Sequence, residues 1–193
     1  MKKIIILFIC SLFVGCANKS ENVSPYISLM ELSASQQEIL DLLLHPGQEF
    51  FLFEYANGMF TEIGIWVEVY HYGELIEQYG NLTTFSNSPM EAEPIVINIW
   101  QPNRNEFQWN LSIGGSRSSS GPWTAQGEFP LRSFSPIREP VEIISGQEII
   151  LYISKFTTGN SISSAGDLQY YLQHPEELAG YTYVYLIKAR FTE

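Results

Sequence analysis

Apolar and polar residues alternate with a period of two over most of the chain after residue 48. Such alternation is typical of a β-strand that buries one face and exposes the other. The segment 106–113 shows it most clearly, because aromatic and aliphatic residues occupy every second position. The apolar set is Phe107, Trp109, Leu111 and Ile113, and the polar set between them is Gln108, Asn110 and Ser112. This segment therefore predicts a half-buried strand.

Further segments combine this period with β-branched and aromatic residues, which favour strands. These segments are 49–55, 61–71, 74–79, 94–100, 147–156 and 181–191. Asn57-Gly58 predicts a hairpin between 49–55 and 61–71, because Asn-Gly is a strong hairpin signal, and Tyr72-Gly73 predicts a second hairpin. Seven to eight strands joined by turns predict a mainly β fold, an antiparallel, immunoglobulin-like β-sandwich.

One segment before the strands has a helical period instead. We expect Ser33 to cap a helix over 33–44, since Gln36 three residues later completes a capping box. Pro46 and Gly47 end this helix, because the residue before a proline disfavours helical geometry and glycine permits a tight turn. The helix carries apolar residues at helical spacing on one face: Ile39, Leu40, Leu43 and Leu44.

Two polar segments interrupt the strand pattern. The Gly- and Ser-rich segment 114–122 predicts a flexible loop, and 157–166 predicts another that leads into a short helix over 167–174. Binding sites concentrate on loops carried by rigid scaffolds, and Trp and Arg are enriched at binding hot spots. Arg117 in the first loop and Trp123 beside it are therefore possible ligand contacts. The alternative for Trp123 is that its ring packs into the core.

The first sixteen residues have the layout of an export signal. Lys2 and Lys3 precede an apolar run over 4–13 that is too short to cross a bilayer, and small residues follow it. The closing sequence Leu12-Phe13-Val14-Gly15-Cys16 resembles the lipobox of bacterial lipoproteins. That resemblance implies cleavage before Cys16, lipidation of its thiol and attachment to the outer side of a bacterial membrane, in the cell envelope. We therefore expect a signal peptide over 1–15, a lipidated cysteine and tether over 16–28, and a single β-sandwich domain with its N-terminal helix over 29–193.

Composition excludes some classes of partner. The formal net charge is −11, so the chain repels phosphates and anionic head groups, and we expect no nucleic-acid partner. The two cysteines are Cys10, inside the signal, and Cys16, so the domain has neither a disulfide nor a thiolate metal site. His45, His71 and His174 lack the spacing of a zinc site. We expect no metal and no cofactor.

Catalytic motifs are also missing from the sequence. The nucleophile elbow Gly-x-Ser-x-Gly does not occur, because the run from Gly114 keeps only its first half. Glycosidases use two carboxylates about 5 to 10 Å apart, and Glu62, Glu68 or Glu106 could be placed in that way. Isolated strand glutamates more often face solvent. The four tryptophans could stack on a sugar or a peptide, or fill the core: Trp66, Trp100, Trp109 and Trp123.

Three functions remain open from the sequence. The favoured interpretation is a lipid-anchored, non-catalytic binding or assembly module with an unknown protein or glycan ligand. The first alternative is a glycan-active hydrolase of the cell envelope that uses a pair of glutamates. The second is an accessory subunit that docks to a membrane transporter or sensor through a sheet edge.

Overall fold

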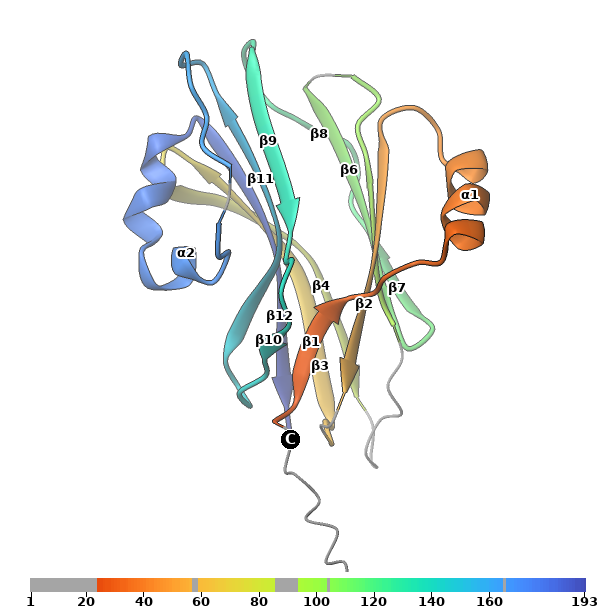
Figure 1. The fold of residues 1–193 in the computed structure, drawn as a ribbon. Coiled ribbons are helices and arrows are strands. Elements are labelled where there is room, and N and C mark those ends of the chain that lie inside the picture. The colour runs from red at the N-terminus through yellow and green to blue at the C-terminus, as the bar shows by residue number, and fades with distance from the viewer. Residues whose placement is uncertain (1–23, 57–58, 86–93, 104, 165) are drawn as a thin grey trace, which may run out of the picture.

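Two antiparallel sheets face each other in the computed structural model, which describes residues 24–193 apart from 57–58, 86–93, 104 and 165 (Figure 1). The seven-stranded sheet has the order β10 (Val141–Glu142), β1 (Tyr26–Leu29), β2 (Gln48–Ala56), β5 (Ile95–Trp100), β6 (Glu106–Ile113) and β7 (Ser116–Ser119), with β8 (Trp123–Thr124) also paired to β6. The five-stranded sheet has the order β4 (Glu74–Phe85), β3 (Glu62–His71), β12 (Tyr183–Thr192), β11 (Glu148–Thr157) and β9 (Leu131–Pro136). The mainly β prediction is confirmed, and the arrangement is consistent with a sandwich.

The core lies between the sheets and follows from the period-two pattern. In β6 the four apolar residues from Phe107 to Ile113 are buried, as predicted. From the opposite sheet, Tyr79 stacks on Trp109 with ring centroids 5.8 Å apart, and Tyr185 contacts Phe107 at 4.9 Å. Aromatic side chains of both inner faces thus interdigitate, which joins the two layers.

The outer side of the five-stranded sheet is partly covered as well. The chain from 158 to 182 lies over it and includes α2 (Tyr170–Gln173) and the 3-10 turn η1 (Pro175–Gly180) (Figure 1). Leu168 and Leu178 from this segment are buried. As a result β12 is buried on both faces from Tyr183 to Ala189. The short helix predicted over 167–174 is confirmed, although α2 is shorter.

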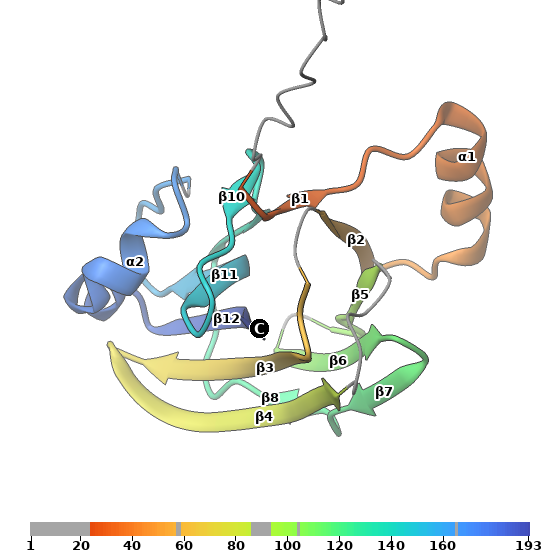
Figure 2. The same ribbon diagram turned by 90° about the horizontal axis from the view of Figure 1, so that it is seen from below.

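Helix α1 (Ala34–Leu43) has the predicted capping box, in which Ser33 and Gln36 bond each other's backbone N–H groups. Its apolar residues are not buried, however, and Leu42 and Leu43 are 81% and 71% exposed. Figure 2 shows that α1 stands away from the sheets beside β2. The local sequence therefore predicted the helix but not how it packs.

The hairpin predicted between 49–55 and 61–71 is wrong. Both strands form, but β2 pairs with β1 and β5, whereas β3 pairs with β4 and β12 in the other sheet. The chain crosses between the sheets here, and the buried Phe60 packs on Tyr55 and Phe191 with centroids 6.0 and 5.0 Å apart. The gain from this burial outweighs the local turn preference; Asn57 and Gly58 lie outside the described residues. The hairpin at Tyr72-Gly73 is confirmed, with φ of 49° and 83°.

Four other expectations need correction. The segment 114–122 is not a flexible loop, because β7 pairs with β6 after a tight turn at Gly114 and Gly115, whose φ values of 55° and 73° suit a two-residue hairpin. Strand β1 begins at Tyr26, inside the expected tether. The described residues form twelve strands rather than seven or eight. In an immunoglobulin sheet the second strand is followed by the fifth and then the fourth, whereas β2 is followed by β5 and then β6.

Candidate functional site

The four tryptophans differ sharply in their surroundings. Trp109 is buried in the core, and Trp66 is buried with its Nε1 donating to Glu68 at 2.8 Å. Trp123 is half-buried, and its ring meets those of Tyr183 and Tyr185 edge-on at 5.2 and 5.1 Å. Trp100 at the end of β5 is 37% exposed. Of the four rings, Trp100 is therefore the one that a ligand can reach most easily.

Trp100 belongs to the outer face of the seven-stranded sheet. Residues that pair directly across antiparallel strands point to the same face, so two rows cross β5, β6 and β7 on this side. One row is Asn98, Asn110 and Ser119, and the next is Val96, Ser112 and Arg117. We call these six residues together with Trp100 the Asn98 face. Figure 2 shows α1 and the β6–β7 hairpin projecting to the same side of β5.

A concavity of about 470 Å³ lies on the Asn98 face. Its lining includes every residue of the two rows. This volume is in the range of small-molecule sites. The lining is mostly polar, because two amides and three hydroxyls accompany two aliphatic residues, Val96 and Leu111, and a single cation.

Asn98, which lines this concavity, has a buried side-chain oxygen atom without a hydrogen-bond partner. Within the described part of the chain, Asn98 Oδ1 is one of two such side-chain atoms; the other is Tyr185 Oη in the core. An unsatisfied buried acceptor costs about 1–3 kcal/mol. Asn98 also interrupts a strand in which Ile95, Ile97 and Ile99 are buried. The fold itself gains nothing visible from this amide.

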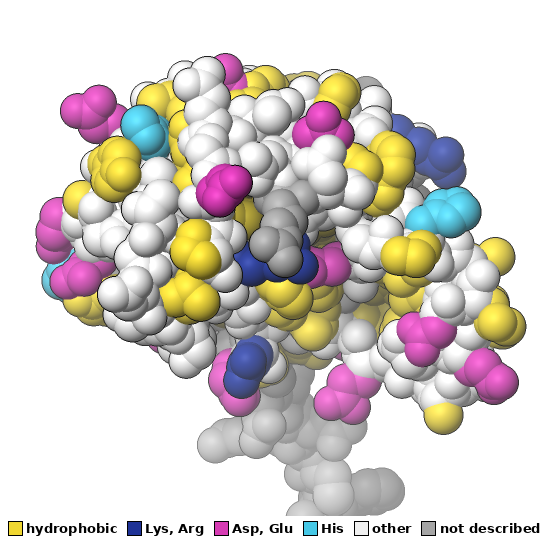
Figure 3. Space-filling view, turned by 90° about the horizontal axis from the view of Figure 1, so that it is seen from above, with side chains coloured by type: hydrophobic (Ala, Val, Ile, Leu, Met, Phe, Trp, Pro, Cys, Tyr) yellow, Lys and Arg dark blue, Asp and Glu magenta, His cyan; other side chains and the backbone are white. Residues whose placement is uncertain are grey.

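Charge distinguishes the Asn98 face from the rest of the molecule. Arg117 is the one cation among the residues that line the concavity. On the end of the molecule seen in Figure 3, acidic side chains are spread around the rim and basic ones occur in only a few places. In a chain of net charge −11, an exposed arginine in a neutral concavity is a favourable position for an anionic group.

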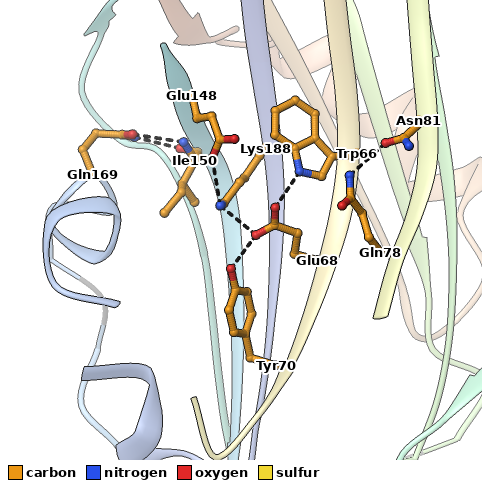
Figure 4. A network of polar contacts seen from close by, with 9 residues as sticks. All are labelled: Trp66, Glu68, Tyr70, Gln78, Asn81, Glu148, Ile150, Gln169 and Lys188. Atoms are coloured by element: carbon orange, nitrogen blue, oxygen red, sulfur yellow. Dashed lines mark hydrogen bonds and ion pairs between the residues drawn. The ribbon is translucent and has the colours of Figure 1, made fainter. Parts of the chain in front are cut away.

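A second polar cluster lies on the outer face of the five-stranded sheet (Figure 4). The buried Lys188 Nζ is 2.7 Å from Glu68 Oε2 and 3.0 Å from Glu148 Oε2. Glu68 also accepts hydrogen bonds from Trp66 Nε1 at 2.8 Å and from Tyr70 Oη at 2.6 Å. We call these five residues the Lys188 cluster. Its side chains point toward one another from β3, β11 and β12, so each charge already has its partner.

The Lys188 cluster also sets the ionisation of Glu68. Burial alone raises the pKa of this carboxyl, but the hydrogen bonds from Lys188, Tyr70 and Trp66 outweigh it and hold the pKa below its usual value. Burial and the bond to Glu68 raise the pKa of Tyr70. Glu68 is therefore an ionised, fully bonded carboxylate at neutral pH, which is unsuited to donating a proton as a general acid.

The predicted glutamates do not form a hydrolase pair with one another. Glu106 is on the outer face of the seven-stranded sheet and Glu68 on the outer face of the other sheet, so the whole core separates them. Glu62 lies six residues from Glu68 along β3, about 20 Å away, against the 5 to 10 Å that such chemistry requires. Glu148, which the sequence did not single out, shares Lys188 with Glu68.

A third set of ionisable groups lies between the sheets. Tyr152 Oη donates to Glu49 Oε2 at 3.0 Å, and burial raises the pKa of both the Glu49 carboxyl and the Tyr152 hydroxyl. Arg132 is close enough to oppose the shift at Glu49. In the described residues, no group of three or more His, Cys, Asp or Glu side chains is arranged to hold a metal ion.

The comparison with protein families covers almost the whole described chain. A model of the YgaN domain matches residues 26–191, which run from the first residue of β1 to the end region of β12. The chain belongs to the YgaN domain family. No match was found among curated proteins or among solved structures. The Asn98 face and the Lys188 cluster both lie inside the YgaN domain.

The YgaN domain places the two predicted contact residues far apart. Arg117 is opposite Ser112 on the outer face, whereas Trp123 is opposite Phe107, whose side chain points into the core. Arg117 lines the concavity, and Trp123 packs on the inner side of the same sheet. The structure therefore does not bring them together. Cys16 lies outside the described residues.

Two of the histidines considered in the sequence stack on tyrosine rings in the YgaN domain. His71 stacks on Tyr183 at 4.6 Å, and His174 stacks on Tyr170 at 4.3 Å beside Glu176. Asn98 and Lys188 were missed by sequence reasoning. Both had a signal, because each is a polar residue inside an otherwise apolar strand. No helix among the described residues is long and apolar enough to cross a membrane.

Proposed function

We propose that this YgaN domain is a non-catalytic binding module, held at the outer side of a bacterial membrane by a lipid on Cys16, and that its ligand binds the Asn98 face. The observation that carries the proposal is the unpartnered Asn98 Oδ1, a buried atom of a residue that lines the concavity. A ligand that turns this amide towards the concavity and donates a hydrogen bond to its oxygen recovers the free energy that the folded protein loses there.

The state of the carboxylates supports a non-catalytic role. Glu68 and Glu148 hold one ammonium group between them. A glycosidase needs one protonated and one ionised carboxyl, but the hydrogen bonds from Lys188, Tyr70 and Trp66 lower the pKa of Glu68 and keep it ionised. The Lys188 cluster therefore serves to hold β3, β11 and β12 together.

The anchoring part of the proposal rests on the sequence around Cys16. Two acyl chains on this cysteine contribute about 0.8 kcal/mol per buried methylene, which makes attachment stable, whereas one chain is marginal. Cys16→Ser should move the protein from the membrane fraction to the soluble fraction or leave it uncleaved. Cys10→Ser is the matched control and should fractionate like the wild type. A Cys16→Ser protein with wild-type fractionation and migration would contradict the anchor.

The binding part can be tested by thermal shift on the full chain in detergent micelles. The probes are maltotriose, chitotriose, trigalacturonate and trialanine. A ligand of the folded state raises the melting temperature in proportion to its saturation of the site. We expect at least one probe to do so in the wild type and not in Asn98→Val. A shift that persists in Asn98→Val would place the binding site elsewhere.

A further inference from the structure

We propose that the Asn98 face binds a short saccharide that carries a carboxylate, such as an oligomer of a uronic acid. This inference rests on the binding module proposed above and specifies its ligand. Three features carry it: the unpartnered acceptor with its polar row, an exposed aromatic ring on the same strand face, and one arginine at the far end of the concavity.

The polar rows match the chemistry of sugar hydroxyls. Asn98 Oδ1 requires a donor, whereas the side chains of Asn110 and Ser119 in the same row both donate and accept. A sugar hydroxyl does both, so vicinal hydroxyls can bond successive strands, which are spaced about 4.8 Å apart. A ligand with only acceptors, such as sulfate, leaves Asn98 unsatisfied.

Trp100 and Val96 provide apolar surface on either side of Asn98. All three side chains point outward from β5, and each neighbour is about 7 Å from Asn98 along the strand. The rings of a saccharide have apolar C–H faces that pack on an aromatic side chain, while their hydroxyls at the edge bond polar groups. The alternation of ring, amide and aliphatic group along β5 therefore suits a chain of sugar units.

Arg117 sets the length and charge of the ligand. It lies two strands from β5, at the other end of the row that begins at Val96 and about 10 Å across the sheet from it. Two or three linked sugar units can span the distance between Asn98 and Arg117. A guanidinium group binds a carboxylate with two parallel hydrogen bonds, which gives direction as well as charge.

A peptide ligand is a weaker fit. Extended peptides bind proteins chiefly by adding a strand to a sheet edge, where their backbone finds partners. Five of the eight lining residues of this concavity lie on the interior strands β5 and β6, and the other three lie on the last strand of the order, β7. Such a site recognises a ligand through hydroxyls and rings rather than through a polypeptide backbone.

Isothermal titration calorimetry with trigalacturonate and its fully methyl-esterified form tests the contribution of the ligand's carboxylate groups separately from that of its sugar rings. We expect the full chain in detergent micelles to bind the acid more tightly than the ester. Arg117→Gln should weaken binding of the acid about tenfold or more and abolish the preference, because a charge-assisted bond is lost. Trp100→Ala should weaken both forms. Arg138→Gln, at another exposed arginine, is the matched control and should change neither.

Three results would overturn the inference. The first is the absence of heat with trigalacturonate. The second is equal affinity for acid and ester. The third is a preference for the acid that survives Arg117→Gln. Binding of maltotriose or chitotriose that is lost in Asn98→Val would leave the binding module intact and remove only the carboxylate. The two proposals therefore fail separately.

Discussion

Substitution of Lys188 by methionine tests whether the Lys188 cluster holds the five-stranded sheet together. The ammonium group is buried with Glu68 at 2.7 Å, while Trp66 and Tyr70 supply only neutral donors to the same carboxylate. Removing one member of a buried ion pair leaves an uncompensated charge and costs about 3–5 kcal/mol. A domain of this size is stable by about 5–15 kcal/mol, so the loss is a large fraction of the total.

The acidity of Glu68 gives this substitution a pH signature. The pKa of Glu68 is lowered in the folded protein, so its contribution to stability is present above its unfolded pKa and is lost as the pH falls through the folded value. In Lys188→Met the same carboxyl is buried without its cation, and protonation relieves it. The free-energy difference between wild type and variant should therefore shrink from pH 7 towards pH 4.

Urea unfolding at both pH values, followed by circular dichroism, measures these differences. Glu148→Gln is the control, because Glu148 is 40% exposed and its bond to Lys188 should contribute less than about 1 kcal/mol. The double variant Lys188→Met, Glu68→Gln should recover much of the loss, since no charge then remains unpaired. A loss below about 1 kcal/mol at pH 7, or one that does not fall in acid, would refute the reasoning.

Three further results follow from the packing of Trp123, the burial of Glu49 and the positions of the cysteines. Trp123→Ala should lower the free energy of unfolding by about 3–5 kcal/mol, because its ring packs on Tyr183 and Tyr185. A nearly unchanged melting temperature would contradict this core role. Glu49→Gln should stabilise the protein at pH 7 but not well below pH 4. The pKa of Glu49 is raised in the folded protein, so its ionised form destabilises the fold once the pH has risen through the folded-state pKa. Equal effects at both pH values in urea titrations would refute this. Neither EDTA nor a reductant should lower the melting temperature by scanning calorimetry, since the two cysteines lie at 10 and 16; a drop with either reagent would reveal a metal or disulfide.

Local signals in the sequence were sufficient for the elements. The capping box at Ser33 and Gln36 involves residues three apart, and the buried face of β6 follows from its own alternation. Pairing of strands is different, because it depends on burial between distant segments. Asn57-Gly58 favours a hairpin locally but could not show that β2 and β3 enter different sheets.

The sites were harder to predict because their parts are distant in the chain. Lys188 meets Glu68 across 120 positions, and a lysine in an apolar strand identifies a buried charge without naming its partner. Asn98 is likewise visible as one amide among Ile and Val residues. The register of β5 with β6 shows which face Asn98 occupies. The structure also shows that its oxygen has no partner among the described residues.

The stability of Asn98→Val tests most directly the claim that the Asn98 face is a ligand site rather than a structural feature. Removing a buried acceptor without a partner should raise the free energy of unfolding by about 1–3 kcal/mol in the ligand-free protein. Valine also favours strands, so Asn110→Val, at the exposed partner position on β6, is the control that accounts for this gain. We predict that Asn98→Val is more stable than both the wild type and Asn110→Val in urea unfolding. An Asn98→Val protein less stable than the wild type would show that the amide supports the fold, and would contradict the account.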